Sequence, residues 1–174
     1  MAECTIVKLA DKIKNGTSWQ NLPGICYWQN QIPQNTVELP EFAQVAIKTA
    51  DGYQSFMQMF SIFSDNQDSI TARVLSQKTD DRWLIINPPA PPLETAELDN
   101  IYGLPFEYDL HPEAAKQGKV TALDTIRFSL TTHRGCYGAC NFCAIAVHQG
   151  RRVTSRSEES LLSEAKRMIK HPRF

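Results

Sequence analysis

The chain is organised around residues 133–150, which read His-Arg-Gly-Cys-Tyr-Gly-Ala-Cys-Asn-Phe-Cys-Ala-Ile-Ala-Val-His-Gln-Gly. This stretch places Cys136, Cys140 and Cys143 in one short loop, in a C-x-x-x-C-x-x-C spacing. Such spacing allows three sulfurs to point at a common centre, as iron–sulfur clusters require of thiolate ligands. Two glycines beside Cys136 give the backbone the freedom that a tight loop needs. The stretch therefore predicts a metal centre.

Three cysteines would bind three irons of a [4Fe–4S] cluster and leave the fourth iron without a protein ligand. A ferredoxin would supply a fourth cysteine, but the other two cysteines of this chain, Cys4 and Cys26, lie far upstream. Cysteine outside a site packs like a small hydrophobic residue. We therefore expect Cys4 and Cys26 to be buried or half-buried and to bind no metal.

The motif resembles that of the radical S-adenosylmethionine (SAM) superfamily, in which an aromatic residue precedes the last cysteine. Cys136, Cys140, Phe142 and Cys143 match it. The resemblance implies a [4Fe–4S] cluster on the three cysteines, with its open iron chelated by the amino and carboxylate groups of SAM. It also implies that Phe142 lies against the adenine side of SAM.

The flanking sequence resembles the YgiQ family of uncharacterised radical SAM proteins. The resemblance implies reductive cleavage of SAM to a 5′-deoxyadenosyl radical, with an unknown substrate and a reducing electron donor as further partners. The segments that carry it are Asn87-Pro-Pro-Ala-Pro-Pro92, Leu104-Pro-Phe106, Ile126-Arg-Phe-Ser129, Thr132-His-Arg-Gly-Cys136, His148-Gln-Gly-Arg151 and Ser155-Arg-Ser-Glu-Glu-Ser160.

Members of that family are several times longer than a chain that contains only the start of a barrel. This sequence has 174 residues. The superfamily segments that hold the methionine amino group and the ribose of SAM come later in complete relatives. We therefore expect a fragment truncated at both ends, with the cluster ligands present and the SAM pocket incomplete. Whether this chain alone is an enzyme stays open at this point.

Composition describes an ordinary globular protein, with 42% hydrophobic and 21% charged residues. No apolar run is long enough to span a membrane, and the first residues lack the basic and apolar segments of a secretory signal. The five cysteines are an odd number, and three of them are too close together for a secreted disulfide framework. These features favour a cytoplasmic location, which suits a cluster that needs reduced thiols.

Positive charge concentrates around the cysteines. Residues 133–174 contain eight Lys and Arg against three Glu, a net charge of +5, which leaves −6 for the rest of a chain whose total is −1. Arg134, Arg151 and Arg152 flank the loop, where cations would favour an anionic ligand, although a solvated surface explains them equally well. The basic residues lack interleaved aromatic residues, so nucleic acid is a poor candidate partner.

Two other classes of function remain. Zinc accepts three cysteines and one histidine at short spacing, so His133 or His148 could complete a structural Cys₃His knuckle. Alternatively, the chain could be a non-catalytic interaction fragment that binds no metal.

The fold class expected is α/β, beginning with an α+β region over residues 1–122. Apolar periodicity predicts a first helix at 3–13 and a long amphipathic helix over 41–63, whose Phe/Met stripe should pack on the core. Residues 25–28 should form a strand, 29–40 a linker and 70–87 a hairpin. A proline-rich extended segment at 88–92 should lead to a helix at 95–102 capped by Thr95, followed by an irregular connection.

A second region over residues 123–174 should begin with a strand at 125–131, where apolar and polar residues alternate. The cysteine loop follows the strand, and a helical stripe from Leu161 to Ile169 follows the loop. Strand, cysteine loop and helix would form the first βα unit of a radical SAM partial (β/α) barrel, with reactive groups at the carboxyl end of the strand.

Overall fold

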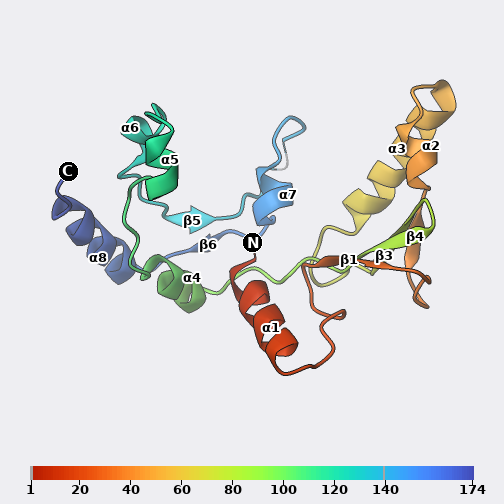
Figure 1. The fold of residues 1–174 in the computed structure, drawn as a ribbon, viewed down its shortest axis with the longest axis horizontal. Helices are drawn as coiled ribbons and strands as arrows, with labels where there is room; N and C mark the ends of the chain where they lie inside the picture. The colour runs from red at the N-terminus through yellow and green to blue at the C-terminus, as the bar shows by residue number, and fades with distance from the viewer. Residues whose placement is uncertain (1, 139) are drawn as a thin grey trace. The chain divides into compact units, whose positions relative to one another are not determined.

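The computed structural model describes residues 2–138 and 140–174, and the chain divides into two compact units (Figure 1). The first unit comprises Met1–Pro92 and Cys140–Gly150, and the second comprises Leu93–Ala139 and Arg151–Phe174. Within the described residues, no helix is both long enough and apolar enough to cross a membrane. The expected domain boundary at residues 122 and 123 stays a prediction.

The first unit is built around a four-stranded mixed sheet with strand order β1-β4-β3-β2. Strands β1, β4 and β3 pair antiparallel, whereas β2 runs parallel to β3. The predicted first helix, first strand and hairpin are confirmed, but the expected linker contains β2. The elements are α1 (Glu3–Lys14), β1 (Cys26–Gln29), β2 (Val37–Leu39), α2 (Phe42–Ala46), α3 (Ala50–Asp65), β3 (Leu75–Thr79), β4 (Arg82–Ile86) and α7 (Ile145–Gln149).

The core of this unit is small and partly polar. Four apolar residues are buried, namely Leu22, Leu39, Leu75 and Ile85. Buried Asn87 follows β4, and its side-chain amide donates to the carbonyl oxygens of Gln20 (2.6 Å) and Leu22 (2.7 Å). A buried polar side chain has to be satisfied in this way, so Asn87 fixes the loop before β1 against the end of β4.

The long helix predicted over residues 41–63 is split into α2 and α3. The break falls at Ile47–Thr49, slightly before the Asp51-Gly52 pair. Thr49 caps α3, since its side-chain oxygen accepts a hydrogen bond from the Gly52 amide (3.3 Å). A Cβ at Gly52 would collide with the Ile47 carbonyl oxygen, so the sharp turn between the two helices requires glycine.

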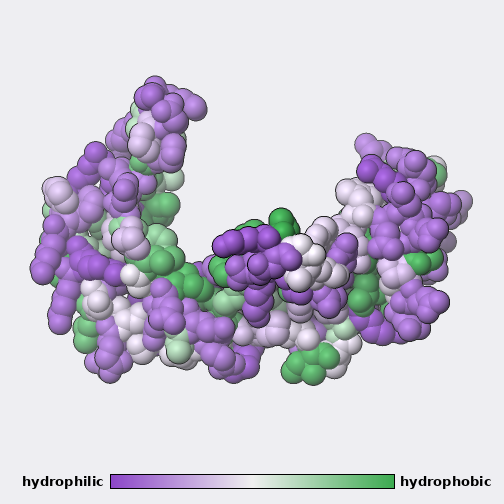
Figure 2. Space-filling model, turned by 60° about the horizontal axis from the view of Figure 1, so that its bottom comes forward, coloured by the Kyte–Doolittle hydropathy of each residue, from purple (hydrophilic) through white to green (hydrophobic). Residues whose placement is uncertain are grey.

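The prediction that the apolar stripe of α3 packs on the core is wrong. Phe56 and Phe60 stack on each other with ring centroids 6.4 Å apart, but both are exposed, and Tyr53 and Met57 are 64% and 61% exposed. Hydrophobic residues also reach the surface in several other separate places (Figure 2). In α3, only Gly52 is buried, so the apolar stripe of this helix faces solvent.

The second unit consists mainly of helices with one short antiparallel strand pair, β5 with β6. Its α4 helix lies where the sequence predicted it, but the cap is Glu94 and not Thr95, because Glu94 and Glu97 form a reciprocal capping box. The expected irregular connection contains α5. The elements are α4 (Thr95–Tyr102), α5 (Pro112–Lys116), α6 (Leu123–Ile126), β5 (His133–Arg134), β6 (Thr154–Ser155) and α8 (Glu158–Ile169).

The predicted strand at residues 125–131 is wrong: α6 occupies its start, and within the described residues the strand between α6 and the cysteines is the two-residue β5. Local interactions favour the helical turn, since the Thr125 hydroxyl donates to the Ala122 carbonyl (2.8 Å). The Arg127 guanidinium is also engaged elsewhere, with the Asp109 carboxylate at 2.9 Å. Alternation alone does not make a strand when no neighbouring strand pairs with it.

Helix α8 confirms the helix predicted after the cysteine loop. Its cap is Ser157, whose hydroxyl accepts a hydrogen bond from the Ser160 amide (3.1 Å). Among the described residues of this unit, the buried apolar residues are Leu98 of α4 and Met168 of α8. Helices α4 and α8 contact each other.

Candidate functional site

The cysteine loop is irregular over its described residues, as predicted for a segment that wraps metal ligands. Cys136 and Cys143 are half-buried, Cys140 is exposed, and all three are thiols rather than disulfides. The Gly138 amide donates to the Cys136 sulfur (3.4 Å), and the Cys143 amide donates to the Cys140 carbonyl (3.0 Å). The backbone of the loop thus forms two local turns, one at Cys136 and one at Cys140.

The entrance to the loop requires glycine at position 135. Gly135 has a φ of +88°, a left-handed conformation that other residues rarely adopt. In addition, a Cβ there would collide with the Arg152 carbonyl oxygen and lie 3.3 Å from the Val153 Cα. The backbone before Cys136 therefore runs against the backbone before β6, and only glycine permits this approach.

The predicted ligands are divided between the two compact units. Cys136 belongs to the second unit, whereas Cys140 and Cys143 belong to the first. Over residues 2–138 and 140–174, no group of three or more His, Cys, Asp or Glu side chains is arranged to hold a metal ion. Phe142, the predicted adenine contact, is 93% exposed beside Cys143.

Two of the three arginines that flank the loop have structural partners. The Arg134 guanidinium lies over the Tyr102 ring, 5.2 Å from its centroid, and its Nε donates to the Tyr102 hydroxyl (3.4 Å). Arg152 forms an ion pair with the Glu94 carboxylate (3.1 Å). Arg151 is exposed. The two candidate zinc-binding histidines fall in different units, with His133 in β5 and His148 in α7.

Cys4 is half-buried, as predicted, but Cys26 is exposed at the start of β1. The prediction was wrong for Cys26 because β1 is an edge strand that pairs only with β4. An edge strand leaves one side accessible to solvent.

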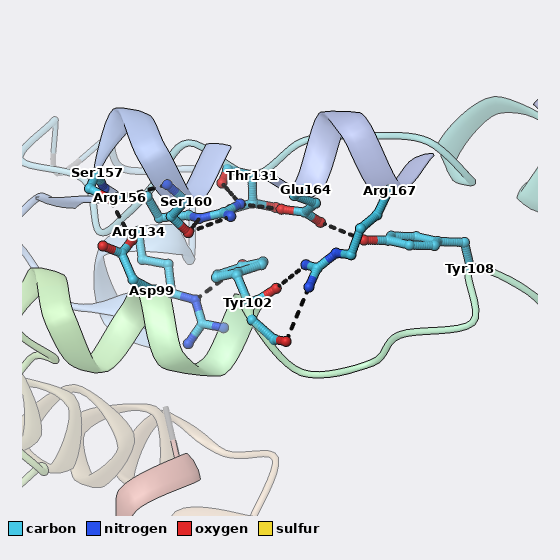
Figure 3. A network of polar contacts seen from close by, with 11 residues as sticks. Asp99, Tyr102, Tyr108, Thr131, Arg134, Arg156, Ser157, Ser160, Glu164 and Arg167 are labelled. Carbon is cyan, nitrogen blue, oxygen red and sulfur yellow. Dashed lines mark hydrogen bonds and ion pairs between the residues drawn. The ribbon is translucent and has the colours of Figure 1, made fainter. Parts of the chain in front are cut away.

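A buried polar network adjoins the cysteine loop within the second unit (Figure 3). At its centre, the Arg156 guanidinium is fully buried and forms an ion pair with the Glu164 carboxylate, which is 4% exposed. Arg156 also donates to the Thr131 carbonyl (3.1 Å) and to the Ser160 hydroxyl (2.8 Å from Nη2). The Tyr108 hydroxyl donates to the second Glu164 oxygen (3.1 Å).

Sequence reasoning missed this network, although a signal was present. Arg156, Ser160 and Glu164 recur every fourth residue, and this spacing places side chains on one face of a helix. The same helix carries the apolar stripe that ends at Ile169. The spacing indicates that the three side chains share a face, but it does not show that this face is buried.

Electrostatics at the edge of the network shift two pKa values. Burial alone would raise the pKa of Asp99, but hydrogen bonds from Ser157 and Ser160 and the positive charge of Arg156 outweigh it and lower the pKa. The Asp99 carboxylate accepts the Ser157 amide (3.0 Å) at the start of α8. Burial raises the pKa of Tyr108, and its hydrogen bond to Glu164 raises it further.

A sequence model of the family described as Radical SAM N-terminal matches residues 1–129 of the 174-residue chain. The chain belongs to the radical SAM N-terminal family. The matched range ends before Cys136, so the cysteine loop follows the part of this chain that defines the family. No solved structure matches the chain.

Relatives of this radical SAM N-terminal chain align over the cysteine loop as well. A UPF0313 protein of Fusobacterium nucleatum is 45% identical over 174 residues, which is 100% of this chain and 30% of the relative. A UPF0313 protein of Clostridium perfringens is 37% identical over 180 residues, covering 100% of this chain and 27% of the relative. A UPF0313 protein of Clostridium botulinum is 36% identical over 173 residues, covering 97% of this chain and 26% of the relative. The chain thus spans less than a third of the length of these relatives.

The residues present fit an iron–sulfur cluster in their chemistry. Three thiols in one loop form the all-sulfur donor set that such clusters use, and the Gly138 amide already donates to one of the sulfurs.

Proposed function

We propose that this chain carries the [4Fe–4S]-binding loop of a radical SAM protein of the YgiQ type. Cys136, Cys140 and Cys143 are the ligands in this proposal. The observation that carries it is the C-x-x-x-C-x-x-C spacing in a chain of the radical SAM N-terminal family, at the end of the range that defines the family. Three ligands leave one iron open for SAM.

The chemistry that the cluster and SAM supply when bound is reductive cleavage of SAM to methionine and a 5′-deoxyadenosyl radical. The residues of this chain hold and orient these groups. Gly135 turns the backbone into the loop, and the Gly138 amide donates a hydrogen bond to the Cys136 sulfur. Phe142 is exposed and available to stack on the adenine of SAM.

The remaining parts of the proposal concern the longer protein. Because the chain spans less than a third of its relatives' length, we place substrate selection, and the rest of the SAM pocket and partial (β/α) barrel, in the complete protein. Its partners would be SAM, an unidentified substrate and a reducing electron donor in the cytoplasm, where thiols stay reduced.

Anaerobic reconstitution with iron and sulfide tests the proposal. The chain should bind about four irons and show the visible absorption of an oxygen-sensitive cluster. Substitution of any one ligand, for example Cys140→Ala, should abolish it. Cys4→Ser and Cys26→Ser are matched controls that remove a thiol elsewhere and should leave the iron content unchanged.

Two outcomes would overturn the proposal. Tight binding of one zinc per chain without iron–sulfur absorption would favour the Cys₃His knuckle and would predict loss of zinc in His133→Ala or His148→Ala. A chain that binds neither zinc nor an iron–sulfur cluster would favour a non-catalytic interaction role. Addition of SAM and dithionite, followed by chromatography for 5′-deoxyadenosine, then measures how much of the cleavage activity this chain supports by itself.

A further inference from the structure

Arg156 lies between β6 and α8, in a position that stability alone does not explain. Its side chain is fully buried and paired with Glu164. Removing two charges from water is costly, and apolar side chains of similar volume are often at least as stabilising as a buried ion pair. We therefore infer the role of the pair from the groups to which Arg156 donates hydrogen bonds.

The bonds from Arg156 lead to the backbone that enters the cysteine loop. Its guanidinium donates to the Thr131 carbonyl (3.1 Å), and its own backbone amide donates to the Thr132 carbonyl (2.9 Å). These two carbonyls immediately precede β5, which is followed by Gly135 and Cys136. One residue thus holds the start of β5 at two successive positions.

A second set of contacts holds β5 through one of its side chains, that of Arg134. The Tyr102 ring at the end of α4 lies under both the Arg156 guanidinium, 4.3 Å from its centroid, and the Arg134 guanidinium, 5.2 Å from its centroid. Arg134 is a residue of β5 (Figure 3). The aromatic face attracts both cations, so α4, β5 and the segment before α8 are held together through Tyr102.

Glu164 and Ser160 fix the Arg156 side chain itself. Glu164 accepts from both Arg156 and the Tyr108 hydroxyl, and the Ser160 hydroxyl accepts from the Nε (3.2 Å) and Nη2 (2.8 Å) atoms of Arg156. A planar guanidinium with several fixed partners has one orientation, which a flexible ammonium does not reproduce. The network therefore has the geometry of a rigid support.

We propose that Arg156 is a positioning residue for Cys136: held by Glu164 and Ser160, it fixes the backbone at Thr131 and Thr132 so that β5 presents Cys136 to the cluster. The inference rests on the proposed function. Residues that orient metal ligands from outside the ligand set typically change metal affinity by about 10- to 100-fold when they are replaced.

The test compares Arg156→Met, Arg156→Lys and Arg127→Met in the full chain. Arg127 is the matched control, because its guanidinium is also largely buried and ion-paired, with the Asp109 carboxylate at 2.9 Å, and donates to the Tyr108 carbonyl at 2.8 Å. None of these contacts involves β5 or β6. The readouts are the half-life of the reconstituted cluster towards a chelator, and hydrogen exchange of the His133 and Arg134 amides in the metal-free chain.

We expect Arg156→Met to shorten the cluster half-life by about tenfold or more and to speed exchange in β5, whereas Arg127→Met leaves both near wild type. Arg156→Lys should resemble Arg156→Met, because positioning depends on the shape of the guanidinium. Full rescue by lysine would reduce the role to one of charge and would overturn the inference. Equal half-lives in Arg156→Met and Arg127→Met would overturn it as well.

Two further measurements distinguish failure of the proposed function and misfolding of a variant from failure of this inference. If wild type binds no iron–sulfur cluster, the proposed function itself fails and the positioning role falls with it. If circular dichroism shows that Arg156→Met does not fold, Ser160→Ala decides, since it removes one partner of the guanidinium while alanine favours helix. Ser160→Ala should shorten the half-life by a smaller factor, and an unchanged half-life would reject the proposal.

Discussion

Replacing Gly135 with alanine should damage the second unit more than an ordinary glycine substitution does. Gly135 adopts a φ of +88° at the entrance to the cysteine loop. An alanine Cβ there would meet the Arg152 carbonyl oxygen at less than contact distance and would also touch the Val153 Cα. Both neighbours are backbone atoms, so neither can rotate away as a side-chain tip would.

The expected cost has two parts. A left-handed backbone costs a residue with a Cβ about 1–2 kcal/mol. Relieving the overlap requires a backbone shift where β5 pairs with β6, which we place at about 1–3 kcal/mol by analogy with other strained backbone sites. The total of about 2–5 kcal/mol is a large fraction of the stability of a small domain, which is about 5–15 kcal/mol.

The position of the tryptophans makes this loss measurable in one unit at a time. Trp19, Trp28 and Trp83 all belong to the first unit, so their fluorescence reports its unfolding in urea. Hydrogen exchange of the α8 amides reports the second unit. Gly135→Ala should lower protection in α8 and leave the tryptophan transition nearly unchanged.

Gly118→Ala is the matched control in the same unit. Gly118 also has a positive φ, +121°, but no atom lies within 4 Å of the position that its Cβ would take. Its loop therefore has room to readjust. We expect Gly118→Ala to lose less free energy of unfolding than Gly135→Ala by at least about 1 kcal/mol, which is the lower estimate for relieving the overlap at Gly135. Equal losses of α8 protection in the two variants would refute the argument that the backbone contact at Arg152 demands glycine.

Further predictions concern pH and one buried amide. The folded pKa of Asp99 is lower than its ordinary value of 3.8. The stability that Asp99 contributes is therefore present above about pH 4 and is lost as the pH falls further. Asp99→Asn should remove this acid-dependent step from thermal unfolding curves. The folded pKa of Tyr108 is higher than 10.0, so its contribution is complete below pH 10 and is lost as the pH rises through the raised value; a matching alkaline step should be absent in Tyr108→Phe. Asn87→Ala should destabilise the first unit by about 1–3 kcal/mol, because it leaves two carbonyls without their donor; tryptophan fluorescence in urea measures this, and exposed Asn30→Ala should differ from wild type by less than about 0.5 kcal/mol.

Elements that depend on neighbouring residues could be predicted from the sequence. Helix α8 combines an apolar stripe with Ser157 as its cap, and the β3–β4 hairpin has a polar turn between two β-rich runs. In both cases the determining interactions lie within a few residues of one another. The cysteine motif is readable for the same reason, since all three thiols lie in one loop.

Elements that depend on distant residues were missed. Strand β2 has three residues and exists through parallel pairing with β3, in which Val37 lies opposite Leu75. The alternation at residues 125–131 suggested a strand, but Arg127 pairs with distant Asp109 and the chain turns into α6. The Arg156 network was missed because its partners Thr131 and Tyr108 come from other segments. Periodicity carries no information about such contacts.

Cluster binding and ordering of the cysteine loop should be coupled. The loop has local turns, with hydrogen bonds from the Gly138 amide to the Cys136 sulfur and from the Cys143 amide to the Cys140 carbonyl. Metal–ligand bonds supply folding free energy to a small metal-binding segment, and each thiol loses its proton as it binds. Because every bond helps to order the loop for the other two, removing one cysteine removes part of the ordering as well as a ligand. Single substitutions at Cys136, Cys140 and Cys143 should therefore each abolish cluster binding rather than weaken it by a third.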